Sequence, residues 1–179
     1  MAKTLIKNAR LVNDGRTVEG DLLIDGERIA RVGGEIAAAD APVVDARGLF
    51  LMPGMIDDQV HFREPGLTHK ADLMTESRAA VAGGITSFMD MPNTQPQTVT
   101  LAALEAKFAL AAGRAWGNYA FYLGATNDNI EEIRRLDRNQ TCGVKVFMGA
   151  STGNMLVDDP AVLDVLFRDV PTLLAAHCE

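Results

Sequence analysis

One strand-like run carries polar side chains that would not fit in a hydrophobic core. In the stretch PGMIDDQVHFREPG, residues 53–66, Gln59, His61 and Arg63 are spaced two apart, so a strand would place them on one face. Two histidines at positions i and i+2 would indicate a metal site, and here Gln59 stands at the first of them. Arg63 either pairs with a neighbouring carboxylate, Glu64 or Asp58, or binds a substrate carboxylate through its planar fork. The stretch is therefore either a metal site with one altered ligand or another kind of polar site.

Three more polar residues lie in or after apolar runs. Lys145 lies inside CGVKVFMGAS, where a lysine must be paired, neutralised, modified or extended to solvent, because a buried ammonium is costly. Asn93 follows Met-Pro, where it either forms a turn or binds a ligand. His177 ends the run PTLLAAHCE, as a core histidine or as a ligand.

The spacing of these residues points to repeated strand–helix units. His61 and Asn93 are 32 residues apart, and so are Lys145 and His177. A βα unit takes about 30 residues or more, so these residues fall near the carboxyl ends of successive strands. In a β/α barrel, that is the face on which active sites are built.

The wider pattern agrees with this architecture from Met52 onward. It predicts strands over 52–62, 85–92, 117–125, 142–149 and 171–178, and helices over 71–82, 98–113, 129–138 and 160–169. Apolar strands that alternate with helices predict a parallel sheet. A complete eight-stranded barrel takes about 250 residues, so we expect a partial TIM-like (β/α) barrel over 52–179.

Residues 1–51 follow a different pattern. Alternating apolar runs are separated by turn signals at Asn13-Asp14-Gly15 and Asp25-Gly26. We expect a small antiparallel β-sandwich segment over 1–51, followed by the partial barrel, and so an α/β protein.

Charge and hydrophobicity exclude several classes of partner. The 179 residues carry a net charge of −7, which argues against a nucleic-acid partner because such a partner needs a basic surface. No run is long and apolar enough to span a membrane, and the first residues lead into a strand-like run, not a signal peptide. We therefore expect a cytoplasmic protein.

Four motifs in order along the chain resemble the cyclic amidohydrolase superfamily, and within it the dihydroorotase family. They are PGMIDD with HFREPG, then AAVAGGITSFMDMPNTQP, then KVFMGAS, then HCE. The HFREPG and MPNT motifs are also similar to allantoinases, and KVFM to hydantoinases. The resemblance implies a metal-dependent hydrolase with a β/α barrel, a flanking β-sandwich and one or two zinc ions. The reaction would be the reversible hydrolysis of dihydroorotate to N-carbamoyl-L-aspartate in pyrimidine biosynthesis.

The same resemblance assigns roles to the polar residues. His61 and His177 would be metal ligands, and Lys145 would be a carboxylated lysine that bridges two metals. Arg63 and Asn93 would bind the substrate carboxylate. Gln59 departs from the family's His-x-His pair, and as a ligand it would be weak or absent because an amide oxygen binds zinc less well than imidazole.

A second departure from the family pattern is that the family's general-base aspartate would lie beyond Glu179 and is not among these residues. We therefore assign no catalytic residue within the chain and expect it to be inactive alone. Two alternatives stay open: a non-catalytic dihydroorotase-like subunit that assembles with a carbamoyltransferase, and an allantoinase or hydantoinase. Uncovered apolar strand edges also predict a homo-oligomer or a companion fragment.

Overall fold

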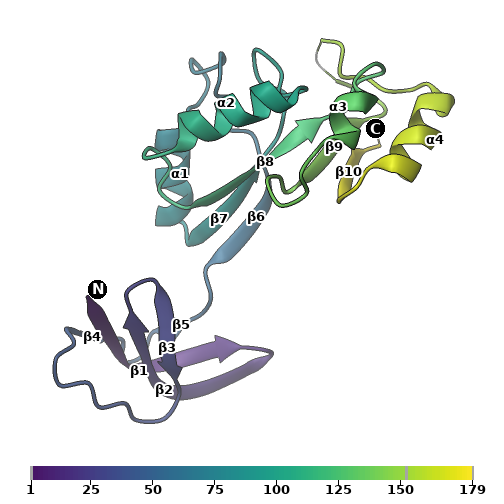
Figure 1. Ribbon diagram of the computed structural model, residues 1–179. Helices are drawn as coiled ribbons and strands as arrows, with labels where there is room; N and C mark the ends of the chain where they lie inside the picture. The colour runs from purple at the N-terminus through teal and green to yellow at the C-terminus, as the bar shows by residue number, and fades with distance from the viewer. Residues whose placement is uncertain (1, 152, 179) are drawn as a thin grey trace. The chain divides into compact units, whose positions relative to one another are not determined.

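The computed structural model describes residues 2–151 and 153–178. Contacts between residues divide the chain into two units, Met1–Pro53 and Gly54–Glu179. The sequence pattern places this division between residues 51 and 52. Figure 1 shows the first unit as strands only and the second as strands alternating with helices.

The first unit is a five-stranded sheet. Its strands are β1 (Lys3–Asn13), β2 (Arg16–Asp25), β3 (Arg28–Val32), β4 (Val43–Asp45) and β5 (Phe50–Leu51). The order is β3-β2-β1-β4, and β5 also pairs with β1. The β1–β2 hairpin turns at Asp14 and Gly15, which have φ angles of 48° and 70°, as a tight two-residue turn requires.

The antiparallel prediction is confirmed for β1–β3 and wrong for β4 and β5. Both of these strands pair with β1 in the parallel direction. The segment between β3 and β4 carries the chain from one edge of the sheet to the far side of β1. A crossing connection of this kind allows parallel pairing, whereas a tight hairpin forces antiparallel pairing.

The second unit is a curled parallel sheet with the order β10-β9-β8-β7-β6. Its elements are β6 (Met55–Val60), α1 (Leu73–Ala82), β7 (Ile85–Asp90), α2 (Leu101–Ala111), β8 (Asn118–Gly124), α3 (Ile130–Arg134), β9 (Gly143–Phe147), α4 (Pro160–Asp169) and β10 (Leu174–His177). The predicted partial barrel is thus confirmed, with each strand followed by a helix until β10.

Side-chain caps set where three of the helices begin. Asp72 accepts hydrogen bonds from the amides of Met74 and Thr75 at the start of α1. Thr100 caps α2, and Asp159 caps α4 immediately before Pro160 at the first helical position. These caps fix the helix starts, and so the lengths of the loops that follow the strands.

Helix α3 is shorter than the predicted helix over 129–138. It ends at Arg134, and Leu136 turns inward to the core. Shortly afterwards the Asp137 carboxylate accepts from the amide of Asn139 at 2.9 Å. Aspartate and asparagine form such local turns at the expense of helix, which accounts for the early end.

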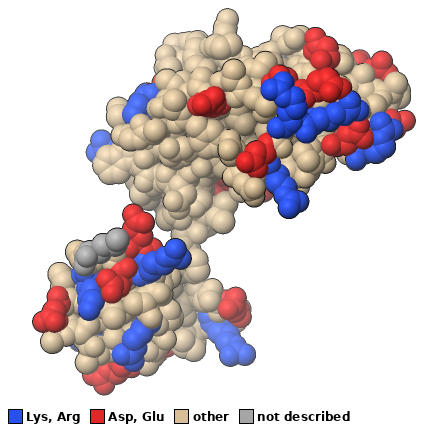
Figure 2. Space-filling model, viewed as in Figure 1, with Lys and Arg blue, Asp and Glu red and all other residues tan. Residues whose placement is uncertain are grey.

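The core of the second unit lies between the sheet and its helices. Phe88, Phe121 and Val144 come from the strands, and Leu104 and Leu166 from the helices; all are at most 4% exposed. Figure 2 shows acidic and basic side chains mixed over the part of this unit where α3 and α4 lie. None of the helices in the described residues is long and apolar enough to cross a membrane.

Candidate functional site at the strand ends

The segment that follows β6 is held by the loop that follows β7. The strand ends at Val60, and Arg63 has a φ of 66°. The alternation of side chains that we expected of a strand therefore does not extend to Arg63. Gly66 has a φ of 82°, and a Cβ there would lie 1.7 Å from the carbonyl oxygen of Gln95. Gln95 also donates its amide hydrogen to the carbonyl of Pro65 at 3.0 Å. Only glycine permits this close approach of the two loops.

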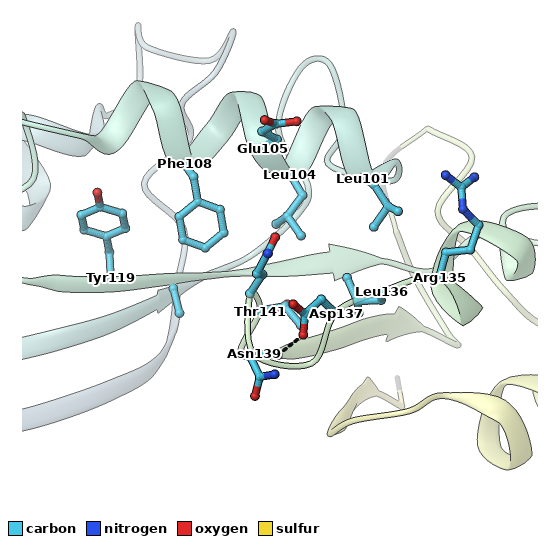
Figure 3. A pocket seen from close by; sticks show the side chains of 12 residues that line it. Leu101, Leu104, Glu105, Phe108, Tyr119, Arg135, Leu136, Asp137, Asn139 and Thr141 are labelled. Atoms are coloured by element: carbon cyan, nitrogen blue, oxygen red, sulfur yellow. Dashed lines mark hydrogen bonds between the residues drawn. The ribbon is translucent and has the colours of Figure 1, made fainter.

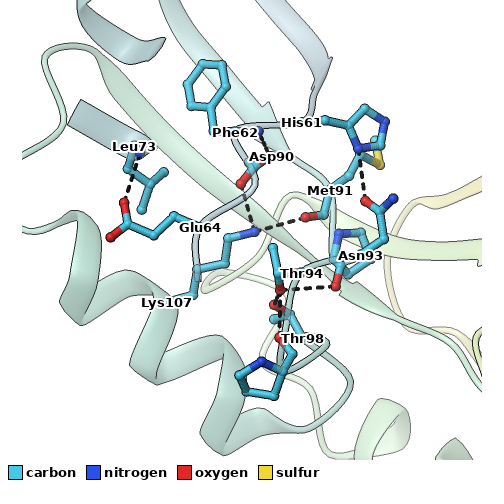
Figure 4. A network of polar contacts seen from close by, with 12 residues as sticks. His61, Phe62, Glu64, Leu73, Asp90, Met91, Asn93, Thr94, Thr98 and Lys107 are labelled. Atoms are coloured by element: carbon cyan, nitrogen blue, oxygen red, sulfur yellow. Dashed lines mark hydrogen bonds and ion pairs between the residues drawn. The ribbon is translucent and has the colours of Figure 1, made fainter. Parts of the chain in front are cut away.

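His61 and Asn93 meet across these loops. His61 Nδ1 lies 2.9 Å from Asn93 Oδ1 (Figure 4). Because an amide oxygen accepts, Nδ1 carries the proton and the Nε2 lone pair stays free. Burial lowers the pKa of His61 below 6.5 and the positive charges of Arg63 and Lys145 add to this effect, against the Asn93 hydrogen bond and the Asp90 charge. This shift favours the neutral imidazole, on which the charges of two predicted site residues act.

Arg63 keeps its charge available because its acidic neighbour has another partner. Glu64 forms a two-pronged ion pair with Arg114, at 2.8 and 3.2 Å, and also accepts from the amide of Leu73 at 2.9 Å. The local pairing of Arg63 with Glu64 is therefore wrong. Arg63 is half-buried, and within residues 2–151 and 153–178 it makes no ion pair.

A buried ion pair lies behind His61 and Asn93, and the sequence reasoning missed it. Lys107 Nζ is 2.8 Å from Asp90 Oδ2, and both side chains are fully buried. A signal was present, since Lys107 shares the inward face of its helix with Leu104 and Ala111, and Asp90 lies in an apolar strand. The spacing alone could not show that these two residues are partners.

Lys145 lies in the middle of a strand in which every residue is buried. Its side chain is 3% exposed, and its ammonium lies 5.1 Å from the ring centre of Phe147. Burial lowers the pKa of Lys145 below 10.5, with a smaller opposing effect from Cys178. No carboxylate pairs with Lys145 among the described residues. The interpretation that this lysine extends to solvent is therefore wrong.

His177 and Gln59 are less confined. His177 pairs in register with Phe147 at the end of β10, with ring centres 5.8 Å apart, and its side chain is exposed. Gln59 is also exposed, and it lies where the β6–β7 register shifts. The structure thus brings His61 together with Asn93. Lys145 of β9 pairs in register with Gly124 of β8 on one side and with Ala175 of β10 on the other.

Comparison with known proteins identifies the family. Residues 50–153, more than half of the chain, match the Amidohydrolase family. The chain belongs to the amidohydrolase family. A dihydroorotase from Methanosarcina acetivorans is 34% identical over 178 residues, which cover 97% of this chain and 38% of that protein. An allantoinase from Solibacter usitatus is 36% identical over 152 residues, covering 84% of this chain and 33% of that protein.

A solved structure supports the same assignment for this amidohydrolase. The L-hydantoinase (dihydropyrimidinase) from Arthrobacter aurescens has a TM-score of 0.91 at 30% identity, covering 99% of this chain and 41% of that one. The amidohydrolase chain therefore spans between 33% and 41% of the length of these three relatives. The family and the fold are shown, while the substrate differs among the relatives.

The described residues of this amidohydrolase fit a metal centre in part. His61 offers a free Nε2 whose ring is oriented through Nδ1, which is the arrangement that metal-bound histidines have. His177 and Lys145 offer two further nitrogens. No group of three or more His, Cys, Asp and Glu side chains that could hold a metal occurs in the described part of the chain. Two imidazoles and an amine supply donors without negative charge, so they form only part of a ligand set for zinc.

A separate cleft of about 660 Å³ lies on the helix side of the sheet (Figure 3). Leu104 and Phe108 of α2, Tyr119 of β8 and the segment after α3 line it. None of the predicted site residues lines this cleft. It is therefore distinct from the site at the strand ends of this amidohydrolase.

Proposed function

We propose that this chain belongs to a cytoplasmic, zinc-dependent dihydroorotase that interconverts dihydroorotate and N-carbamoyl-L-aspartate in pyrimidine biosynthesis. The chain would supply the substrate-binding side and part of the metal site. The proposal rests on Arg63, whose guanidinium can bind a ligand. A half-buried guanidinium without an ion pair beside the His61–Asn93 couple fits a ligand that brings its own carboxylate.

The chemistry of the candidate substrates favours the one with an acid group. Dihydroorotate is a cyclic amide with a carboxylate on its ring, whereas hydantoin, allantoin and dihydrouracil have none. The fork of Arg63 can bind a carboxylate through two parallel hydrogen bonds. Asn93 accepts from His61 through Oδ1, so its Nδ2 hydrogens remain for a substrate oxygen.

Lys145 and the two histidines would hold the metal. Zinc, when bound, would activate water and polarise the ring carbonyl. The lowered pKa of Lys145 favours the neutral amine, which is the form that can react with carbon dioxide. In that reaction the nitrogen forms a bond to carbon and releases a proton, so a buried neutral amine becomes an anionic ligand. This supplies the negative charge that the described ligand set otherwise lacks.

We further propose that the chain is inactive alone and has a companion, either a second copy or a separate fragment. The general base of the reaction would then come from outside it. Met55 and Ile56 on the β6 edge and Leu173 beside β10 are exposed, and apolar strand edges favour such pairing. Gln59, in an irregular part of β6, would contribute little to metal binding, because an amide oxygen binds zinc less well than imidazole.

An allantoinase or hydantoinase is the second candidate. The similarity to an allantoinase and to an L-hydantoinase favours it. For those substrates Arg63 would have no carboxylate to bind. The two candidates therefore differ in whether binding depends on Arg63.

Matched ligands test the proposal on the chain itself. Calorimetric titration with Zn²⁺ present would compare dihydroorotate with dihydrouracil, the same ring without the carboxylate, and with allantoin. We expect dihydroorotate to bind wild type at least about tenfold more tightly than Arg63→Met, because a charge-assisted bidentate contact is lost. Dihydrouracil should bind both proteins equally. Equal binding of all three ligands by wild type and Arg63→Met would overturn the dihydroorotase proposal, and allantoin binding alone would favour the second candidate.

A further inference from the structure

The buried pair of Asp90 and Lys107 has no role in the function described so far. Both side chains are completely removed from solvent, and their charged atoms are 2.8 Å apart. Burying two charges costs several kcal/mol for each, so such a pair is often no more stabilising than apolar side chains of the same size. Stability alone is therefore a poor explanation for its presence.

Each member of the pair also contacts the backbone next to a substrate-side residue. Asp90 Oδ1 accepts from the amide of Phe62 at 2.9 Å, between His61 and Arg63. Lys107 Nζ donates to the carbonyl of Met91 at 2.9 Å, two residues before Asn93. Figure 4 shows both contacts beside the His61–Asn93 hydrogen bond.

The surroundings leave Lys107 no alternative position. Its ammonium lies 4.9 Å from the ring centre of Phe121, and its stem belongs to the buried face of α2. Burial lowers the pKa of Lys107, while the Asp90 charge acts against that shift. The pair thus links three elements, β6, β7 and α2, through contacts that solvent cannot replace.

We propose that Asp90 and Lys107 are positioning residues that hold the ends of β6 and β7 in register, so that His61, Arg63 and Asn93 face a common ligand. This inference rests on the proposed function only for the identity of that ligand. The pair does not touch the substrate. It acts through Phe62 and Met91, whose backbone it fixes.

A neutral double variant separates positioning from stability. Asp90→Asn with Lys107→Met removes both charges, so no buried charge is left unpaired, and the asparagine retains an Oδ1 acceptor for Phe62. The Met91 carbonyl loses its donor. Asp90→Asn alone is not used as a control, because it would leave the Lys107 ammonium buried and unpaired. Arg134→Met, which breaks the exposed pair with Asp169 at 2.6 Å, controls for the loss of an ion pair elsewhere.

Amide hydrogen exchange on the ligand-free chain gives the readout. In the double variant we expect exchange at Met91 and Gln95 to be at least about tenfold faster than in wild type, while the urea midpoint shifts little. Arg134→Met should leave exchange at these two amides within about threefold of wild type. Dihydroorotate binding should weaken in the double variant and not in Arg134→Met.

Two results would overturn the inference. One is that the amides of Met91 and Gln95 exchange in the double variant at the same rate as in wild type. The other is faster exchange spread evenly over the second unit in proportion to lost stability, which would indicate a purely structural pair. If the double variant does not fold, Asp90→Asn with Lys107→Gln is read in the same way, since glutamine is too short to retain the contact. Because exchange is measured without ligand, a failure of dihydroorotate to bind wild type would count against the proposed function and not against positioning.

Discussion

The candidate site lies at two ends of the parallel sheet, the β6–β7 end and the β9–β10 end, and the protein supports these two ends in different ways. After β6 and β7, nearly every polar group has a partner within the described residues: His61 with Asn93, Asp90 with Lys107, and Glu64 with Arg114. At β9 and β10, Lys145 is buried without a carboxylate partner and His177 is exposed. The first end is preorganised by its own side chains, and the second is not.

This difference matches the division of roles in the proposed function. A substrate-binding surface gains affinity when its groups are already oriented before the ligand arrives. A metal site, in contrast, gains much of its order from the metal itself, because the binding free energy contributes to folding. The supported end would bind the ring and its carboxylate and would offer His61 to the metal, and the less supported end would be completed by that metal and further ligands.

The largest effect is expected at the close approach of the two loops on the supported end. Gly66→Ala would place a Cβ 1.7 Å from the Gln95 carbonyl oxygen at a φ of 82°. We expect the free energy of unfolding to fall by about 2–4 kcal/mol, because both a clash and backbone strain are introduced. Urea denaturation followed by fluorescence measures this loss.

Gly84→Ala is the matched control for that substitution. Gly84 has a φ of 92°, but an added Cβ would meet nothing within 4 Å. Its cost should be limited to backbone strain, about 1–2 kcal/mol. If both variants lost the same stability, the contact between Gly66 and Gln95 would not hold the loops together.

The next effect has the opposite sign and tests the other end of the sheet. Lys145→Met removes a buried amine without a carboxylate partner, so we expect the metal-free chain to gain about 1 kcal/mol of stability at neutral pH. The comparison fails if Lys145→Met is destabilising, because the lysine would then have a stabilising partner.

The pH dependence of that gain follows from the direction of the pKa shift. The folded pKa of Lys145 lies below 10.5, so between the two values the unfolded chain binds more protons and stability rises with pH. The advantage of Lys145→Met should therefore be complete below the folded pKa and disappear as the pH approaches 10.5. Urea midpoints across this range, with the metal removed by a chelator, test this.

The sequence predicted the architecture of the second unit because its signals are local. Apolar strands, capped helices and the 32-residue spacing each depend on residues close together along the chain. That spacing was enough to predict that His61 and Asn93 lie at neighbouring strand ends, and the 2.9 Å contact between them agrees. The short α3 was missed because the turn at Asp137 competes with a helix of ordinary propensity.

Pairings between distant segments could not be predicted in the same way. The partners Glu64 and Arg114 are 50 residues apart, and nothing in either local pattern connects them. The same holds for Asp90 and Lys107, whose burial could be inferred from the helix face but whose contact could not. The parallel pairing of β4 and β5 with β1 also depends on a crossing that composition does not reveal. These long-range contacts are also the ones that orient the candidate site.

The smallest effect is expected at His177, and it gives the most direct comparison of the two ends. His177 is exposed, and the hydrogen bond that its carbonyl accepts from Met148 at 2.8 Å does not involve the side chain. His177→Ala should therefore change the free energy of unfolding by less than about 0.5 kcal/mol. His61→Ala should cost about 1–2 kcal/mol, because it leaves Asn93 without its hydrogen-bond partner. Equal losses in urea denaturation would mean that His177 is held as firmly as His61, and the β9–β10 end would then be preorganised without a metal.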